Sequence, residues 1–509
     1  MILALPIFYL LHAACYLYSA PMNIYLATVI VYLVLMIGIG IWQVRRIRGK
    51  QDEFMVGGRH VSTLMMITTL IATWTGAGSL IGGAGLAYRQ GYSELWMSVG
   101  AWAAILVVYK LAGRVRHIGE YTLPDILEKR YNGFARAMGS IALIIGATTI
   151  VGYQLKGGAF VLELVAGIPW QTGVALIAAM VILFTALAGM ESIVHLDLVN
   201  GILIVVGIVI AVPLVLMSVG GFDTVRAALP AEHFTVLGGH SWVWAFAVFL
   251  PTFLLLLGEP SMYQKFFSTK DERTARRAVV GWVIGIFIID VLICTLAMVG
   301  RAKFPELATS GGAERVILEI ARNGLPVWAG VILLAAGLAV VFSTANSFLL
   351  APATNLTHDI IQRFVSRDLP PRKVILINRL SIIVLGLLAY FLLTRFANVL
   401  SMTLAAYTMI GAALTPAILA AFFWKRVTTA GGVASIIGGI VATVVTKILV
   451  DVAAVQAFFQ GKFGIPAAEL GEYIIIPSFF VAVILLVFVS LATPRQSDEQ
   501  LAAFFPKAR

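Results

Sequence analysis

Long runs of apolar residues, separated by short polar stretches, dominate this chain of 509 residues. A run of about 20 apolar residues is long enough to cross a bilayer as a helix. Thirteen such runs are expected, at approximately residues 24–43, 63–87, 93–113, 135–160, 171–188, 192–218, 239–258, 275–300, 326–350, 372–396, 398–423, 431–450 and 472–492. The pattern predicts an all-α polytopic membrane protein with about thirteen transmembrane helices.

The second run differs from the others because glycines and hydroxyl side chains crowd into its centre. Residues 71–92 read IATWTGAGSLIGGAGLAYRQGY, with Thr73, Thr75 and Ser79 among the glycines. Glycine disfavours a continuous helix, and irregular backbone at membrane depth is tolerated only where it is buried in protein or lines a cavity. Secondary transporters build their substrate and ion sites from such broken helices. This run is therefore predicted to carry the working site of a transporter.

A second interrupted run stands five spans later. The seventh run carries Pro251-Thr252 within VWAFAVFLPTFLLLLGEP. A lone proline often only kinks a helix, but paired interruptions in two halves are typical of inverted repeats. We therefore expect two five-helix units of opposite orientation, at 63–218 and 239–423. The remaining segments are a first helix and loop (24–62), two peripheral helices (431–492) and a cytoplasmic tail (493–509).

Composition and charge agree with a membrane location. Hydrophobic residues make up 60% of the chain and charged residues 12%, while the net charge is +11. Most Lys and Arg residues fall in alternate loops, for example Arg45 and Arg46, and Arg276 and Arg277. Cytoplasmic loops carry such an excess, which predicts an outside N-terminus and a cytoplasmic C-terminus in the cell's inner (plasma) membrane. The basic loops then face anionic lipid headgroups, so the charge does not indicate nucleic acid binding.

The role of residues 1–23 stays open. This apolar segment has no Lys or Arg before Pro21-Met22, whereas a signal peptide usually has a basic start. It is either sequence upstream of a true start at Met22, or an extra helix or signal-like segment. The two cysteines, Cys15 and Cys294, lack a metal-like spacing and are expected to pack as small apolar residues.

Several motifs, in order along residues 24–450, resemble those of the sodium:solute symporter family. They are EFMVGGR at 53–59, ATWTGAGSLIGG at 72–83, YTLPDILEKRY at 121–131, QK at 264–265 with STKD at 268–271, and STANS at 343–347 with HDI at 358–360. The resemblance implies a leucine-transporter (LeuT-type) five-plus-five inverted-repeat core. It also implies sodium-coupled import of a small polar organic solute by alternating access, with sodium as the coupling ion and no cofactor.

The resemblance further implies a sodium site between the second run and the ninth. Its ligands would be the carbonyls of Ala72, Thr75 and Val340 and the hydroxyls of Ser343 and Thr344. A hard monovalent cation prefers oxygen ligands, and neutral oxygens bind it weakly enough to release it. The alternative is that the two hydroxyls bond to carbonyls one turn earlier in their own helix.

A possible second ion site is implied at Asp197, Ser343, Asn346 and Ser347. An acidic residue within a span is a functional candidate because its burial is costly. The chain departs from the family's Thr-Asp-x-x-Gln pattern, since Leu196 precedes Asp197 and Asn200 follows it. Asp197 is therefore a second sodium ligand, a proton carrier, or an interhelical hydrogen-bonding residue.

The candidate solute contacts are Trp74, Gly78, Ser79, Met97, Ser98, Thr252 and Asp290. Sugar-binding relatives place acidic, amide and lysine side chains around the solute, and the aligned positions here lack them. Free amides at the start of a half-helix suit an anionic group. We therefore favour a carboxylate-bearing solute, such as an amino acid or organic acid, over a sugar or sialic-acid-type solute. Asp290 is alternatively a structural hydrogen-bonding residue.

Other classes of protein find little support. The sequence shows no Ser/His/Asp grouping, no HExxH motif and no phosphate-binding glycine loop followed by Lys, so neither an enzyme nor, without a signalling domain, a sensor is indicated. Glu191 and His195 have a metal-like spacing on one helix, but without a second motif they predict a surface ion pair. Coupling to protons instead of sodium is the main alternative.

Overall fold

The computed structural model describes residues 23–47, 61–118, 122–309, 311–366, 369–396, 398–497, 501 and 504–505. The predictions for residues 1–22, including Cys15, for the motif at 53–59 and for most of the tail lie outside these ranges. Within them the regular elements are helices, apart from one isolated bridge between Val61 and Thr269.

The longer helices are α2 (Ile24–Ile47), α6 (Leu95–Ile118), α8 (Gly133–Ala166), α9 (Trp170–Ser218), α11 (Trp242–Gly258), α13 (Glu272–Lys303), α15 (Val327–Thr354), α16 (Pro371–Leu392), α17 (Val399–Phe423), α18 (Thr429–Val450) and α20 (Ile475–Ala492). Shorter elements include α4 (Thr63–Trp74), η2 (Gly78–Gly83), α5 (Ala84–Gln90), α7 (Leu123–Arg130), α10 (Phe222–Ala228), α12 (Pro260–Ser268), η8 (Asn355–Val365) and α19 (Ala453–Phe463).

The helices match the predicted apolar runs. Among the described residues, 11 helices are long and apolar enough to cross a membrane, and two shorter apolar helices, Ile24–Ile39 and Thr63–Trp74, accompany them. The fifth and sixth runs both lie within α9. This element consists of two helices separated at Gly189, which has φ 68° and ψ 179°. The chain is therefore an all-α polytopic membrane protein with about thirteen spans.

The break in the seventh run lies later than predicted. Pro251 sits inside the continuous helix α11, whereas the chain leaves helical geometry at Glu259, between α11 and α12. The expectation that Pro251 marks the interruption is therefore wrong. Pro260 occupies the first turn of α12, where its missing amide costs no helical hydrogen bond.

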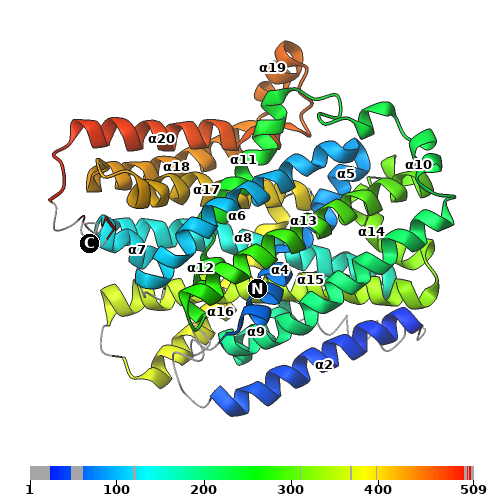
Figure 1. Ribbon diagram of the computed structural model, residues 1–509, viewed down its shortest axis with the longest axis horizontal. Helices are drawn as coiled ribbons and strands as arrows, with labels where there is room; N and C mark the ends of the chain where they lie inside the picture. The colour runs from blue at the N-terminus through cyan, green and yellow to red at the C-terminus, as the bar shows by residue number, and fades with distance from the viewer. Residues whose placement is uncertain are drawn as a thin grey trace.

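The helices α8, α15 and α17 form the centre of the molecule. In Figure 1, α2 runs along one edge and α18 and α20 along the opposite edge, with these central helices between them. The central helices α15 and α17 are the most enclosed, with 78% and 89% of their most apolar segments buried, against 28% for α18 and 33% for α20. The site helices are thus shielded from lipid by the outer ones.

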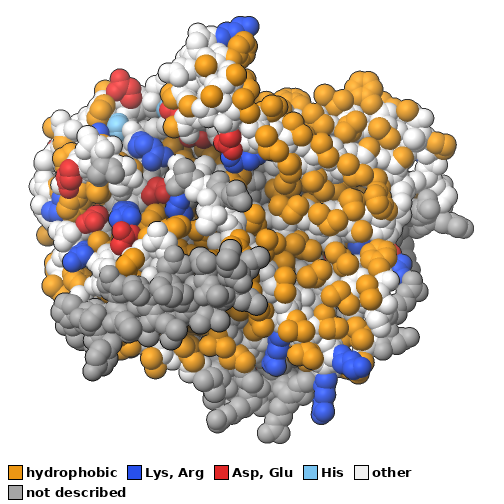
Figure 2. All heavy atoms as spheres, turned by 180° about the vertical axis from the view of Figure 1, so that it is seen from behind, with side chains coloured by type: hydrophobic (Ala, Val, Ile, Leu, Met, Phe, Trp, Pro, Cys, Tyr) orange, Lys and Arg blue, Asp and Glu red, His pale blue; other side chains and the backbone are white. Residues whose placement is uncertain are grey.

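The outer helices expose large apolar side chains, as a bilayer requires. Examples are Val34 on α2, Ile202 on α9, Leu380 on α16, Ile448 on α18 and Phe488 on α20. Figure 2 shows hydrophobic side chains over much of the visible face, while Lys, Arg, Asp and Glu side chains gather in a region at its left. In water such a surface would aggregate, whereas in lipid it costs nothing.

Candidate functional site

The second run is broken between α4 and η2, as its glycines predict. The Gly76 amide donates two residues back, to Trp74 O at 2.8 Å, so Ala72 O loses its usual helical donor. The next amide, of Ala77, donates to the side chain of Gln154 on α8 at 2.9 Å. Two successive carbonyls at the end of α4 are thereby released from the helical ladder.

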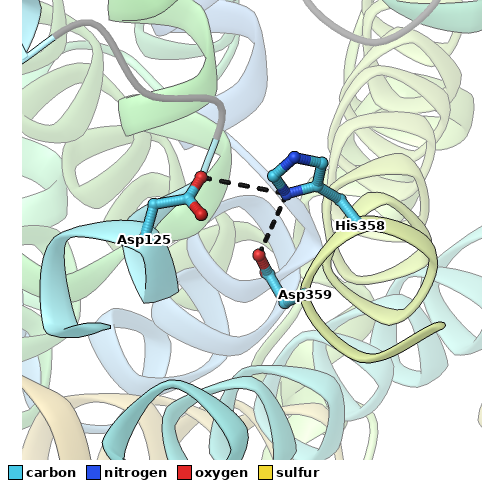
Figure 3. Close-up of side chains that lie close together, drawn as sticks. All are labelled: Asp125, His358 and Asp359. Carbon is cyan, nitrogen blue, oxygen red and sulfur yellow. Dashed lines mark hydrogen bonds and ion pairs between the residues drawn. The ribbon is translucent and has the colours of Figure 1, made fainter. Parts of the chain in front are cut away.

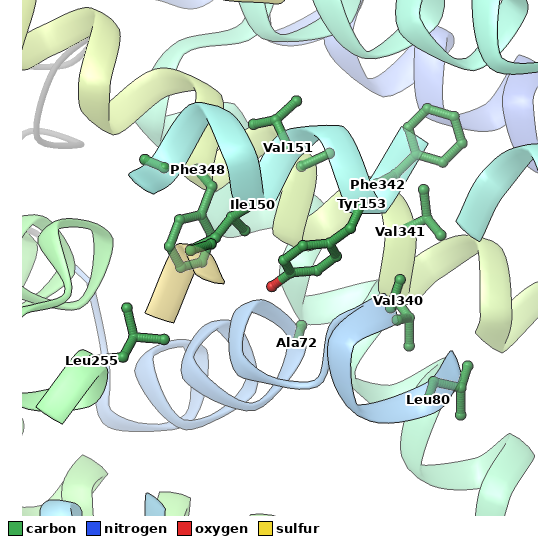
Figure 4. Packing of buried hydrophobic residues seen from close by; sticks show 14 of the residues in the cluster. Ala72, Leu80, Ile150, Val151, Tyr153, Leu255, Val340, Val341, Phe342 and Phe348 are labelled. Carbon is green, nitrogen blue, oxygen red and sulfur yellow. The ribbon is translucent and has the colours of Figure 1, made fainter. Parts of the chain in front are cut away.

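Helix α15 presents a hydroxyl to these carbonyls. Thr344 Oγ1 donates to Thr73 O at 2.9 Å and lies 3.5 Å from Ala72 O, so it bonds across to α4 rather than within its own helix. Thr75 is fully buried at the break. Val340 lies one turn before Thr344 on α15, a helix that packs against α4, and both Val340 and Ala72 are labelled in Figure 4. The structure therefore brings Thr344 of the predicted sodium site to Ala72, while the hydroxyl of Ser343 donates to Asp197 instead.

Asp197 of α9 is the centre of a second cluster beside the break. Its side chain is 0% exposed and accepts hydrogen bonds from Ser343 Oγ and Thr69 Oγ1, each at 2.5 Å. The ammonium of Lys265, on α12, is equally buried and lies 3.2 Å from Asp197 Oδ2. It also donates to Thr69 O at 3.1 Å and to Thr73 Oγ1. The cluster thus contains a fully buried ion pair.

The other two residues expected at a second ion site point to different places. Ser347 Oγ lies 3.2 Å from Thr73 Oγ1, at the margin of the Asp197 cluster. Asn346 Oδ1 instead accepts a hydrogen bond from Thr185 Oγ1 at 2.9 Å, in the first half of α9. The structure therefore brings Ser347, but not Asn346, to the cluster.

The sequence reasoning missed Lys265, Thr69 and Thr73 as members of this cluster. Because the seventh run was expected to end at residue 258, Lys265 fell in a predicted loop and received no role. The available signal was its place in the family-like motif at 264–265. A lysine that enters the membrane region needs a partner, and an acidic residue within a span is the natural one.

Aromatic rings from two other helices contact Trp74 at the end of α4. Trp74 stacks on Tyr407 of α17 with ring centroids 6.4 Å apart, and meets Trp282 of α13 edge-on, also at 6.4 Å. Tyr153 of α8 hydrogen-bonds to Tyr407. A Cβ added at Gly78 would lie 3.1 Å from the Tyr407 hydroxyl, so glycine lets the backbone approach the ring closely. This aromatic cluster offers apolar faces and hydroxyls to a small solute.

The remaining candidates for solute contact lie in differing surroundings. Asp290 of α13 accepts a hydrogen bond from Trp102 Nε1 at 3.0 Å and one from Ser98, both on α6. These contacts are those expected of an interhelical hydrogen-bonding residue. The other candidates are buried (Met97 and Thr252) or partly exposed (Ser79).

A separate charged cluster joins α7, α8 and η8. Asp125, His358 and Asp359 approach one another closely enough to suggest a metal site (Figure 3). Arg136, however, lies 2.7 Å from both carboxylates and supplies the positive charge that a metal would bring. Burial raises the pKa of Asp125, and the Asp359 carboxylate raises it further, while His358 and Arg136 lower it. We interpret this cluster as an ion-pair network.

Two minor predictions have definite outcomes. His195 Nδ1 bonds to the backbone carbonyl of Glu191 at 2.7 Å, and the ion pairs of the described residues do not include the expected pair between these side chains. Cys294 is buried, as expected, with Sγ 3.7 Å from Gly91 O.

Two broken helices at the centre of a helical bundle, with oxygen atoms converging on one break, define a secondary transporter of the LeuT type. The sodium:solute symporter profile matches residues 54–439, and the chain belongs to this family. It is accordingly a multi-pass membrane protein and a sodium-coupled symporter of a small organic solute, not an enzyme.

Similar proteins of known sequence are transporters. The sodium/proline symporter of Escherichia coli (strain K12) is 28% identical over 491 residues, covering 93% of each chain. The osmoregulated proline transporter of Bacillus subtilis (strain 168) is 26% identical, covering 93% of this chain and 96% of the relative.

Solved structures share the fold. A substrate-bound, outward-open Na+-coupled sialic acid symporter has a TM-score of 0.73 at 17% identity, covering 93% of this chain and 99% of that one. A nucleobase-cation-symport-1 family transporter in a closed conformation has a TM-score of 0.60 at 13% identity, covering 89% and 97%. These similarities confirm the predicted fold class.

Proposed function

We propose that this symporter couples one sodium ion, bound at the break between α4 and η2, to the import of a small carboxylate-bearing amino acid. Proline is the first candidate. The ion would be held by the carbonyls of Ala72, Thr75 and Val340 and the hydroxyls of Ser343 and Thr344. Neutral oxygens of this kind suit a hard cation that must be bound on one side of the membrane and released on the other.

One observation carries this proposal: the carbonyls of Ala72, a proposed ligand, and of its neighbour Thr73 have lost their helical donors, and both lie near Thr344 of α15. The Gly76 and Ala77 amides are bonded elsewhere, at 2.8 and 2.9 Å. Thr344 Oγ1 approaches both Ala72 O and Thr73 O. One hydroxyl hydrogen cannot satisfy both carbonyl oxygens, so a cation bound by them would stabilise the break.

The solute proposal rests on the neighbouring aromatic cluster and on the relatives. Trp74, Tyr407 and Trp282 offer apolar faces to a small ring. Trp282 Nε1 is buried and has no hydrogen-bond partner among the described residues, so it can donate to a carboxylate. The two relatives described above are named for proline.

The test is uptake by purified protein in lipid vesicles. Radiolabelled proline should accumulate under an inward sodium gradient and not under a proton gradient alone. Unlabelled proline and other amino acids, a hexose and sialic acid are then compared as competitors. Uptake driven only by protons would overturn the sodium proposal, and competition by the hexose but not by amino acids would overturn the solute proposal.

We further propose the predicted orientation, with the N-terminus outside and the C-terminus in the cytoplasm of the cell's inner (plasma) membrane, and repeat units at 63–218 and 239–423. The distribution of Lys and Arg among the loops supports the orientation. A reporter that is active only outside the cell should stay inactive when it is fused to the C-terminus. Reporter activity would overturn the proposed orientation.

A further inference from the structure

The buried ion pair of Lys265 and Asp197 lies beside the proposed sodium site. Lys265 reaches it because α12 begins at the second helix break. Glu259 caps α12 by accepting hydrogen bonds from the amides of Ser261 and Met262, at 3.0 and 3.1 Å. Helix α12 then packs against α15 and α4, which carries the lysine to the cluster.

The oxygens around the ammonium are those that a sodium ion would take. They are one carboxylate oxygen of Asp197, the hydroxyl of Thr73 and the carbonyl of Thr69. Ser343 supports the same carboxylate from α15 at 2.5 Å. A lysine ammonium is a compact point charge with the charge of sodium, so it can satisfy this oxygen set in place of an ion.

Charge balance argues against a sodium ion beside this lysine. Asp197 supplies one negative charge, and Lys265 already neutralises it with no water-exposed surface on either side chain. Glu259, the other carboxylate that attracts Lys265, keeps its charge, but both of its oxygens accept hydrogen bonds from the amides at the start of α12. A second cation within about 4 Å of the ammonium would bind on the order of a hundredfold more weakly than to the carboxylate alone.

We propose that the ammonium of Lys265 fills the second cation site, so that this symporter carries one exchangeable sodium ion and one built-in cation. The inference rests on the proposed function, because it assigns the exchangeable ion to the α4 break. It gives position 197 a reason to be acidic in a symporter that carries one sodium ion. It also ties α12 to α4 and α9 in a way that a dissociable ion would not.

Sodium binding to purified protein tests this directly. Equilibrium binding of radioactive sodium should give one ion per wild-type chain and two per Lys265→Met chain, because removing the ammonium exposes the Asp197 carboxylate. The measurement is made in alkaline buffer, so that this carboxylate does not take up a proton instead. The double variant Lys265→Met/Asp197→Asn should return to one ion, and Lys462→Met, which removes an exposed lysine of α19, should bind one.

Each outcome decides between the two proposals. A wild-type chain that binds no sodium overturns the proposed sodium coupling. A wild-type chain that binds two ions, or a folded Lys265→Met chain that still binds one, overturns the inference about Lys265. If Lys265→Met does not fold, the double variant, which leaves neither charge unpaired, decides: retention of one ion supports the built-in cation, and loss of bound sodium overturns it.

Discussion

Ser343 and Thr344 are adjacent on α15, but their hydroxyls have different partners. Thr344 contacts the released carbonyls of α4, whereas Ser343 donates to Asp197. Thr344→Ala should therefore remove one oxygen from the sodium site and leave the ion pair intact. We expect the sodium concentration for half-maximal uptake to rise about tenfold, which corresponds to about 1.4 kcal/mol.

A matched control for Thr344→Ala is Thr443→Ala on α18. Thr443 is also buried, but its hydroxyl bonds to Gly439 O of its own helix at 2.8 Å, so sodium dependence should not change. Solute affinity should fall together with sodium affinity in Thr344→Ala, because binding linkage is reciprocal. Wild-type sodium dependence in a folded Thr344→Ala protein would place the ion elsewhere.

The resemblance to the symporter family pointed to Asp197 and Ser343, and for Asp197 the cost of burying an acidic side chain within a span supported that choice. The partner of Asp197 was not found, because Lys265 is 68 residues away in sequence and reaches it only through the turn at Glu259. The hydrogen bond between Asn346 and Thr185 likewise depends on the packing of α15 against α9, which the local sequence around Asn346 does not reveal.

At the scale of the helical element, Gly76 is the position on which the break of α4 depends most. A Cβ there would lie 2.5 Å from Gln154 Nε2 and 3.0 Å from Thr344 Oγ1. Gly76→Ala should therefore displace both side chains, weaken sodium-dependent uptake by at least tenfold, and leave the protein in the membrane. Gly461→Ala on α19, where nothing lies within 4 Å of an added Cβ, should transport like wild type.

The measurement is initial uptake at saturating solute over a range of sodium concentrations. If Gly76→Ala keeps the wild-type sodium response, the break tolerates a side chain and the close approach to α8 is not required for ion binding. Alanine also favours helix more than glycine does, so a lowered sodium affinity would fit partial repair of the helix at this point.

The helix breaks show which interruptions of a helix can be located from a sequence pattern. Gly189 and the glycines after Trp74 mark real departures from helix, because glycine both permits the unusual backbone and weakens the helix. Pro251 does not, since neighbouring helices can satisfy the backbone around a proline at membrane depth, and α11 continues through it. The break lies instead at Glu259, whose capping bonds were not visible in the apolar pattern.

At the scale of the whole molecule, the Arg136 network joins α7, α8 and η8. Arg136 is 7% exposed and contacts the carboxylates of Asp125, Asp359 and Glu128. Removing one partner of a buried pair leaves uncompensated charge, so Arg136→Gln should destabilise the fold by about 3 kcal/mol. Arg276→Gln, which breaks an ion pair 47% exposed on both sides, should cost less than about 1 kcal/mol.

Thermal unfolding in detergent at two pH values measures this effect. Because Arg136 lowers the pKa of Asp125 against burial and Asp359, its loss raises that pKa further. A carboxyl group whose pKa is higher in the folded than in the unfolded protein stabilises the fold at low pH. This contribution to the free energy of unfolding is lost as the pH rises through the folded pKa. The loss of stability of Arg136→Gln relative to wild type should therefore shrink on acidification from about pH 7.5 to about pH 5.5. A loss of stability that grows on acidification would contradict the ion-pair network.

The number of coupled ions sets how far the whole transporter can concentrate its solute. One sodium ion crossing 100 mV contributes about 2.3 kcal/mol, and a tenfold sodium gradient adds about 1.4 kcal/mol. One ion can therefore accumulate a neutral solute by roughly several hundredfold, and two ions by on the order of 10⁵-fold. With Lys265 as the built-in cation, wild-type vesicles at a clamped potential should reach a limit of several hundredfold, measured as the steady-state ratio of labelled proline inside to outside. Accumulation in the wild type far above that limit would require a second transported ion, because the solute gradient cannot store more free energy than the transported ions supply.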